Sequence, residues 1–354
     1  ASIDVSGQIP RISAKLVAGV ISADQFLAKS NTGVKQAIEA GRIDPGMRRW
    51  SRKRLDLDWL TAYDGDVELR ADHLAVGDYD FAGPDIKLLL NNGTLTVRQF
   101  TGQLFGGNLD LRAVLRGQGT PDLSLTFSLS NGSVEQALST LAGLKTAAGT
   151  FSANGSIAAN GSNQFEMISD MTGSATVKAR NGVLRGIDLK RIATGAGNVA
   201  TMDDISKLLS QATTQGTTPY KSIQATLRLD NGTITAQNIS ADIDSSTGAI
   251  DASVDLPHWT ASVDSRFRLK DLAGSPPIGI VLTGALNAPR RDVRTANMEQ
   301  FLAKNVDETM LKGVIEQDNK GLNELLGSGK SPAPETQAPV PNQPAQPQPE
   351  TPQQ

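Results

Sequence analysis

Apolar and polar residues alternate along most of the first 300 positions of the chain. In runs of six to ten residues, every second side chain is aliphatic or Phe and those between are charged, Ser or Thr; Leu123, Leu125, Phe127 and Leu129 form one such run. A period of two predicts β-strands with one dry face and one solvated face. Strands of this kind are typical of antiparallel sheets. The pattern predicts about fifteen of them, more than an ordinary sheet contains.

Asn-Gly dipeptides interrupt the alternation six times. This dipeptide is preferred in two-residue hairpin turns, because both central positions of such a turn need a positive φ. Counting outward from three of these turns places apolar residues opposite one another on one face. The predicted pairs are Leu90 with Leu95 and Leu88 with Val97 around Asn92, Leu229 with Ile234 and Leu227 with Ala236 around Asn231, and Ala179 with Leu184 around Asn181.

Helical patterns are few and short. Ser133 and Gln136 form a capping-box pattern that predicts a helix through Leu141, and 187–192 and 203–211 are two further candidates. A longer amphipathic helix is predicted over 297–327. It is interpreted as a lid on the open end of the sheet or, alternatively, as a membrane-surface helix, although its polar face is not rich in Lys and Arg. The Pro- and Gln-rich residues 328–354 are predicted to be a disordered tail, serving as a spacer or a weak docking peptide.

The body of the chain also repeats itself: Asn92-Gly-Thr-Leu-Thr96 returns as Asn231-Gly-Thr-Ile-Thr235. We therefore expect a mainly β fold, one long curved antiparallel sheet with a few short helices. The predicted division is 1–62 for N-terminal strands and a connecting helix, 63–296 for the main sheet, 297–327 for the amphipathic helix and 328–354 for the tail.

Charge and composition exclude several classes of function. Lys and Arg number 34 against 37 Asp and Glu, a formal net charge of −3, so no positive field favours nucleic acid. Without Cys there is no thiol nucleophile and no Cys-based zinc site. The two histidines cannot form a three-His site; His73, on an apolar strand face, is predicted to be an interior hydrogen-bonded residue. We expect no enzyme activity, no metal and no cofactor.

One basic run stands out, Arg48-Arg49-Trp50-Ser51-Arg52-Lys53-Arg54. Two interpretations are open: a solvated loop, or a contact with anionic lipid headgroups, worth about 1 kcal/mol per charge near a membrane. The headgroup candidates are Arg48, Arg49, Arg52, Lys53 and Arg54.

Several segments resemble the AsmA family of Gram-negative envelope proteins, in its C-terminal region, over about residues 55 to 300. They are Asn92-Gly-Thr-Leu95, Leu104-Phe-Gly-Gly-Asn108, Asp170-Met-Thr-Gly-Ser-Ala-Thr-Val177, Arg180-Asn-Gly-Val-Leu-Arg-Gly-Ile-Asp-Leu189 and Leu282-Thr-Gly-Ala-Leu-Asn-Ala-Pro-Arg290. The resemblance implies a periplasmic body tethered to the inner membrane by an N-terminal helix that is not present in this chain. It also implies similarity to bridge-like lipid transfer proteins, whose repeated β units curl into an open, taco-like groove.

The function implied by this resemblance is movement of phospholipid between envelope membranes, in support of outer-membrane assembly. The partners would be phospholipid acyl chains, the inner or outer membrane, and envelope proteins that bind the Pro-rich tail; no catalytic residues are implied. The alternation predicts that the lipid groove is lined by Val67, Leu69, Ile86, Leu88, Leu90, Leu95, Val97, Leu109, Leu111, Leu123, Leu125, Phe127, Leu227, Leu229, Ile234, Val254, Val263 and Phe267.

Two other classes of function stay open. In the first, the apolar faces close into a core, and the protein is a non-enzymatic envelope scaffold that binds partners through its polar face. In the second, the chain is a carbohydrate-processing or carbohydrate-binding β-solenoid. Such a protein needs aromatic platforms and a carboxylate pair on one surface, and Trp50, Trp59 and Trp259 are too few and too scattered to provide them.

Overall fold

The computed structural model describes residues 2–7, 9–23, 49–306 and 320. The chain divides into two units, Ala1–Val306 and Asp307–Gln354, and the fold described below is that of the first unit. Three predictions concern residues outside the described ranges: the role of Arg48, the amphipathic helix beyond residue 306, and the disordered tail.

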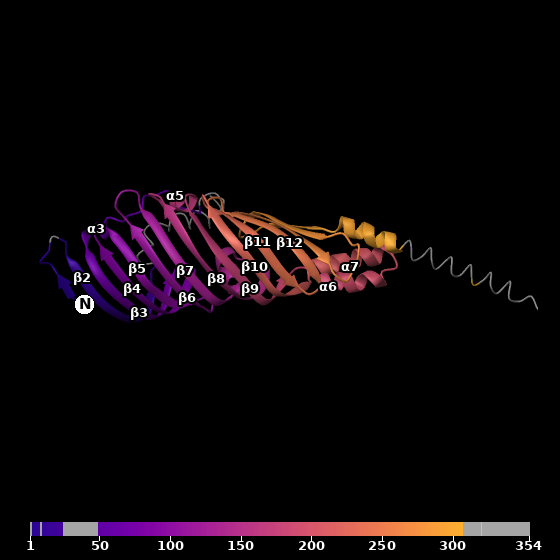
Figure 1. Ribbon diagram of the computed structural model, residues 1–354, viewed down its shortest axis with the longest axis horizontal. Coiled ribbons are helices and arrows are strands. Elements are labelled where there is room, and N and C mark those ends of the chain that lie inside the picture. The colour runs from indigo at the N-terminus through magenta and orange to yellow at the C-terminus, as the bar shows by residue number, and fades with distance from the viewer. Residues whose placement is uncertain (1, 8, 24–48, 307–319, 321–354) are drawn as a thin grey trace, which may run out of the picture. The chain divides into compact units, whose positions relative to one another are not determined.

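A single sheet of 15 strands forms the first unit, and the strands lie in the order of the sequence (Figure 1). Neighbouring strands are antiparallel, except that β2 and β3 are parallel. The strands are β1 Ser2–Asp4, β2 Arg11–Ser22, β3 Asp64–Val76, β4 Tyr79–Asn91, β5 Thr94–Leu104, β6 Gly107–Arg116, β7 Asp122–Ser133, β8 Ala147–Asn160, β9 Thr172–Arg185, β10 Thr217–Asp230, β11 Thr233–Ile243, β12 Ser246–Asp255, β13 Thr260–Leu269, β14 Ile278–Ala285 and β15 Arg290–Arg294. The mainly β prediction is confirmed, and the long sheet is consistent with a β-groove.

Two of the three hairpin predictions are confirmed. Leu90 pairs with Leu95 and Leu88 with Val97 across β4 and β5. The corresponding pairs across β10 and β11 also form, Leu229 with Ile234 and Leu227 with Ala236. At both turns the Asn and the Gly have positive φ, as the turn type requires.

The third hairpin prediction is wrong. β9 runs straight through Asn181 and Gly182, so Ala179 pairs with Phe151 on β8 and Ile223 on β10 instead of Leu184. Asn181 has a φ of 51°, and the pairing with β8 shifts register at this point. The dipeptide therefore makes a β-bulge, which also needs a left-handed residue, and alternation alone does not separate a bulge from a turn.

Short helices lie at the ends of the strands. They are α3 Trp59–Ala62, α4 Val134–Ala142, α5 Gln164–Ser169, α6 Leu189–Gly195 and α7 Met202–Thr214. The predicted cap of α4 is confirmed, because the Ser133 hydroxyl accepts a hydrogen bond from the Gln136 amide at 3.3 Å. Residues 296–306 are also helical. Among the described residues, no helix is long and apolar enough to span a membrane.

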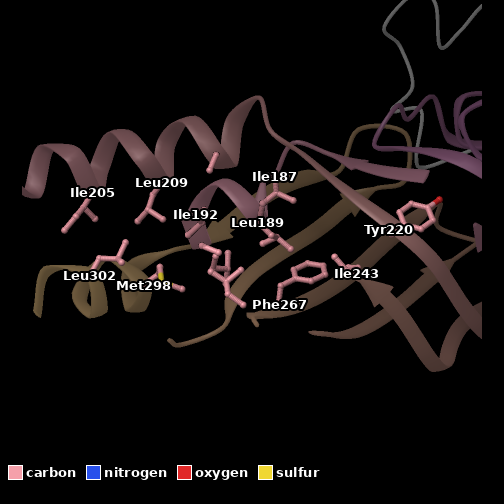
Figure 2. Close-up of a cluster of buried hydrophobic side chains, with 14 residues drawn as sticks. Ile187, Leu189, Ile192, Ile205, Leu209, Tyr220, Ile243, Phe267, Met298 and Leu302 are labelled. Carbon is pink, nitrogen blue, oxygen red and sulfur yellow. The ribbon is translucent and has the colours of Figure 1, made fainter. Parts of the chain in front are cut away.

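A closed hydrophobic core lies where α6, α7 and the helical residues 296–306 meet the strands from β10 onward (Figure 2). Leu189, Ile192, Met298 and Leu302 are all fully buried in it. The start of the predicted C-terminal helix thus packs on the sheet, as the lid interpretation expects. It contacts this end of the sheet because its apolar residues recur at three- and four-residue steps.

Candidate functional site

Two continuous rows of apolar residues cross the sheet. Residues that pair across neighbouring strands share a face, so the pairing registers trace each row directly. The first row contains Ala14, Val67, Leu88, Val97, Ala113, Leu125, Ile157, Gly173, Leu229, Ile234, Val254 and Ala261. The second contains Leu16, Leu69, Ile86, Phe100, Leu111, Phe127, Gly155, Ala175, Leu227, Ala236, Ala252, Val263 and Leu282. We call the surface that carries both rows the apolar face.

The opposite face is polar at equivalent positions. One row there, traced in the same way from β6 to β15, consists of Arg112, Thr126, Ser156, Ser174, Arg228, Thr235, Ser253, Ser262, Thr283 and Arg290. Cross-strand ion pairs lie on this side too, such as Arg70 with Asp85 at 2.9 Å. The two faces of the sheet therefore have opposite chemistry over most of its length.

All 18 residues predicted to line a groove lie on the apolar face. Besides the members of the two rows, Leu90, Leu95 and Leu123 share a third row with Leu115, and Leu109 pairs with Leu129. Fourteen of the 18 are partly exposed, none is fully exposed, and Ile86, Leu109, Leu229 and Phe267 are buried.

Phe267 lies in a different buried cluster from Ile86 and Leu109, which belong to a cluster with Phe100 and Leu129. Its side chain is 2% exposed and belongs to the closed core beneath the helices, where it pairs with Ile278. Alternation identified the correct face for Phe267. It could not show that helices cover this part of the face, because that contact joins segments distant in sequence.

Several residues of the apolar face were missed by the sequence analysis. Phe100 was missed because β5 carries an extra residue between Val97 and Phe100, and this shift breaks the period of two. Leu16 was missed because β2 carries apolar residues on both faces and gives no alternation. Pairing with β3 places Leu16 beside Leu69.

Residues 49–62 form a strap that runs across the ends of the strands on one side of the sheet. It extends from the turn after β12 back to the start of β3. The Trp50 indole donates to the Leu256 carbonyl at 2.7 Å, and the Leu55 amide donates to the Ser162 carbonyl at 2.8 Å. Leu60 is fully buried and occupies the space in which a side chain at Gly117 would lie. The strap therefore joins turns from distant parts of the chain, along the edge that holds α3 and α5 (Figure 1).

The basic run lies on this strap. The Arg49 guanidinium stacks 3.8 Å from the centre of the Trp259 ring, and that of Arg52 lies 3.9 Å from the centre of the Phe165 ring. Arg49, Arg52, Lys53 and Arg54 are exposed and form no ion pair within the described part of the chain. Cation–π contacts of this kind hold two of the cations at fixed places along the edge.

Titratable groups with shifted pKa values are scattered and form no reactive site. The hydrogen bond from Arg185 lowers the pKa of Glu135, and the Thr201 hydroxyl lowers that of Asp204 at a helix cap. Burial raises the pKa of Tyr220, whose hydroxyl donates to the Ala148 carbonyl. Within the described ranges, no three His, Asp or Glu side chains gather as metal ligands.

Both histidines are exposed. The prediction that His73 is an interior residue is wrong: its side chain is 48% exposed, and its Nδ1 lies 3.1 Å from the Asp80 carboxylate. His258 lies in the turn after β12, with Nδ1 2.9 Å from the Asp255 carboxylate. Each histidine has a carboxylate partner and no neighbouring nucleophile among the described contacts.

Comparison with known proteins gives a family but no individual relative. A family model described as the AsmA family matches residues 7–239, which is more than half of the chain. No curated protein and no solved structure matches this chain. AsmA is a bacterial envelope family associated with lipid and membrane biogenesis, and it is not known as an enzyme family. The family match and the long β-sheet agree with the resemblance seen in the sequence, and the chain belongs to the AsmA family.

Proposed function

We propose that this protein carries phospholipid between envelope membranes, on the periplasmic side of the inner membrane, and so supports outer-membrane assembly. The proposal rests on the apolar face: two unbroken rows of aliphatic, aromatic and glycine residues, most of whose predicted lining side chains are partly exposed. Such a surface in water is unfavourable unless it has an occupant, since large exposed apolar patches mark binding sites.

Acyl chains fit the chemistry of this face. Moving a two-chain lipid through water exposes on the order of 30 CH₂ groups, at about 0.8 kcal/mol each, or roughly 25 kcal/mol. A continuous apolar surface removes most of that cost. Hydrocarbon contacts are not directional, so an acyl chain of the lipid can move from Leu125 to Ile157 and onward without breaking a specific bond.

The strap places cations beside the ends of the strands, where lipid headgroups would lie if acyl chains rest on the apolar face. We propose that Arg52, Lys53 and Arg54 contact headgroup phosphates, with Arg49 held in place by Trp259. The same edge carries carboxylates, including Asp170 and Asp255, so the surface suits zwitterionic as well as anionic headgroups.

Lipid transfer between vesicles tests the proposal. Donor vesicles carry a fluorescent phosphatidylethanolamine with a quencher, and unlabelled vesicles accept it. We expect the full chain to accelerate the transfer in proportion to its concentration. The triple variant Arg52→Gln, Lys53→Gln and Arg54→Gln should slow the transfer, while Arg112→Gln, on the polar face, should leave the rate unchanged. A transfer rate equal to that without protein would contradict the proposal.

A closed scaffold remains the second candidate, because one end of the apolar face is covered. The helices over β10 to β15 bury Phe267, Ile243 and Ile278 completely or nearly so. The apolar face over β10 to β15 is therefore an ordinary hydrophobic core. The distinction between the two functions therefore rests on β3 to β8, whose apolar face carries no packed helix among the described elements other than at its edges.

A further inference from the structure

The polar face of the sheet is hollowed over its middle strands. A cavity of about 490 Å³ is lined by residues of β5 to β9. Two cross-strand rows of the polar face line it, the first with Thr96, Val114, Ser124, Ala158 and Thr172 and the second with Arg112, Thr126 and Ser156. The row between them, which contains Leu125 and Ile157, points its side chains to the apolar face and contributes backbone here. We call this hollow the polar trough.

The charge of the polar trough is positive. Its two charged lining residues are Arg98, which lies 3.3 Å from the Asp66 carboxylate, and Arg112. Arg112 is exposed and makes no hydrogen bond or ion pair with any residue that the structure describes. The one carboxylate of β6, Asp110, does not line the trough. A free guanidinium matches the geometry of phosphate and carboxylate groups, so Arg112 offers a place for an anion.

The rest of the polar trough offers uncharged hydrogen-bonding groups. Hydroxyls line it at Thr96, Ser124, Thr126, Ser156 and Thr172. A second hollow of about 330 Å³ shares Ser156 and continues as far as β10, with Asn154, Ser174, Thr176 and Thr226 in its lining and no charged residue. Each hydroxyl both donates and accepts. The two hollows together therefore suit a ligand with one anionic group and a neutral, hydroxyl-rich body.

We infer that the polar trough binds an anionic saccharide, a sugar chain whose carboxylate or phosphate group pairs with Arg112. Its hydroxyls bond to the Ser and Thr side chains, and its C–H groups lie against Val114 and Ala158. The trough crosses five neighbouring strands, a span of about 19 Å at about 4.8 Å between strands, which is long enough for several sugar units. No aromatic side chain of the polar face lines either hollow, so binding rests on hydrogen bonds and one charge, and we expect it to weaken with salt.

The site is separate from the proposed lipid surface. A lipid whose acyl chains rest on the apolar face has its headgroup beyond the ends of the strands, whereas the polar trough lies on the other side of the sheet between those ends. The inference therefore does not depend on whether the apolar face carries lipid.

Saturation-transfer NMR with the full chain tests the inference. The probes are a short glucose oligosaccharide that ends in glucuronate, the same oligosaccharide without the carboxylate, and acetate, which carries the charge alone. We expect saturable binding of the anionic probe and binding weaker by at least about tenfold for the neutral one, since a charge-assisted hydrogen bond is worth about 1.5–3 kcal/mol. Acetate should bind more weakly than the anionic oligosaccharide.

Two arginines of the same row provide a matched pair of variants. Arg112→Gln should weaken binding of the anionic probe by at least about tenfold. The control is Arg228→Gln: Arg228 is exposed and continues the row of Arg112 through Ser156 and Ser174, but it lines neither hollow. We expect this control to leave binding unchanged.

Ala158→Phe gives a second variant, which fills the polar trough and keeps Arg112. Ala158 is exposed, and circular dichroism checks that the variant keeps the β-sheet signal. We expect the folded variant to lose the anionic probe. Absence of saturable binding to the wild type, or equal weakening by Arg112→Gln and Arg228→Gln, would overturn the inference. If acetate binds as tightly as the anionic oligosaccharide, the trough is a simple anion site and the assignment to a saccharide is wrong.

Discussion

Replacing Leu90 with Asp should abolish phospholipid loading, while the same replacement at the adjacent Leu89 should not. Leu90 lies on the apolar face between Gly65 and Leu95, and Leu89 lies on the opposite face between Asp66 and Thr96. Both side chains are partly exposed. A carboxylate against an acyl chain costs several kcal/mol, and each 1.4 kcal/mol is a factor of about ten in affinity.

This pair of variants is closely matched, because the residue type and the strand are the same and both side chains are partly exposed. Lipid is measured after detergent-free purification, and circular dichroism checks that both variants keep the β-sheet signal. We expect Leu90→Asp to retain less than about a tenth of the wild-type lipid, a loss that follows from the same free-energy scale. Equal loading of the two folded variants would show that the face is not selective and would count against a lipid surface.

Truncation of side chains should separate the closed core from the open face. Leu302→Ala removes a fully buried side chain from the core under the helices, and we expect a loss of about 2–5 kcal/mol in the free energy of unfolding. Leu125→Ala, on the partly exposed apolar face, should lower the free energy of unfolding of lipid-free protein by less than half as much. The Leu125 side chain buries less apolar area on folding than a fully buried leucine does.

Urea denaturation of delipidated protein measures both values, with hydrogen exchange in α7 as a local probe for Leu302→Ala. If Leu125→Ala destabilises as strongly as Leu302→Ala, the apolar face over β3 to β8 is a closed core, and the scaffold function becomes the better account.

Alternation predicted the fold class, the approximate number of strands and the correct face for all 18 candidate residues. A period of two is a local property of the sequence. Because each strand pairs with the next one along the chain, local pairing is enough to predict the architecture of the whole sheet. The hairpin at Asn92 illustrates this: its turn residues and register are both contained within ten residues of sequence.

The remaining features depend on contacts between distant segments. The Asn181 bulge, the cover over Phe267 and the stacking of Arg49 on Trp259 each join parts of the chain that no local pattern relates. The basic run could be read as a solvated loop or a lipid contact, but its route along the edge of the sheet required the structure.

Native mass spectrometry of the full chain, purified without detergent, tests the central proposal most directly. If the apolar face carries phospholipid, the protein should appear with bound adducts whose masses match diacyl phospholipids, and the Leu90→Asp variant should lose them. If the wild-type protein shows only the mass of the unliganded polypeptide after such a purification, and its organic extract contains no phospholipid, the account is contradicted.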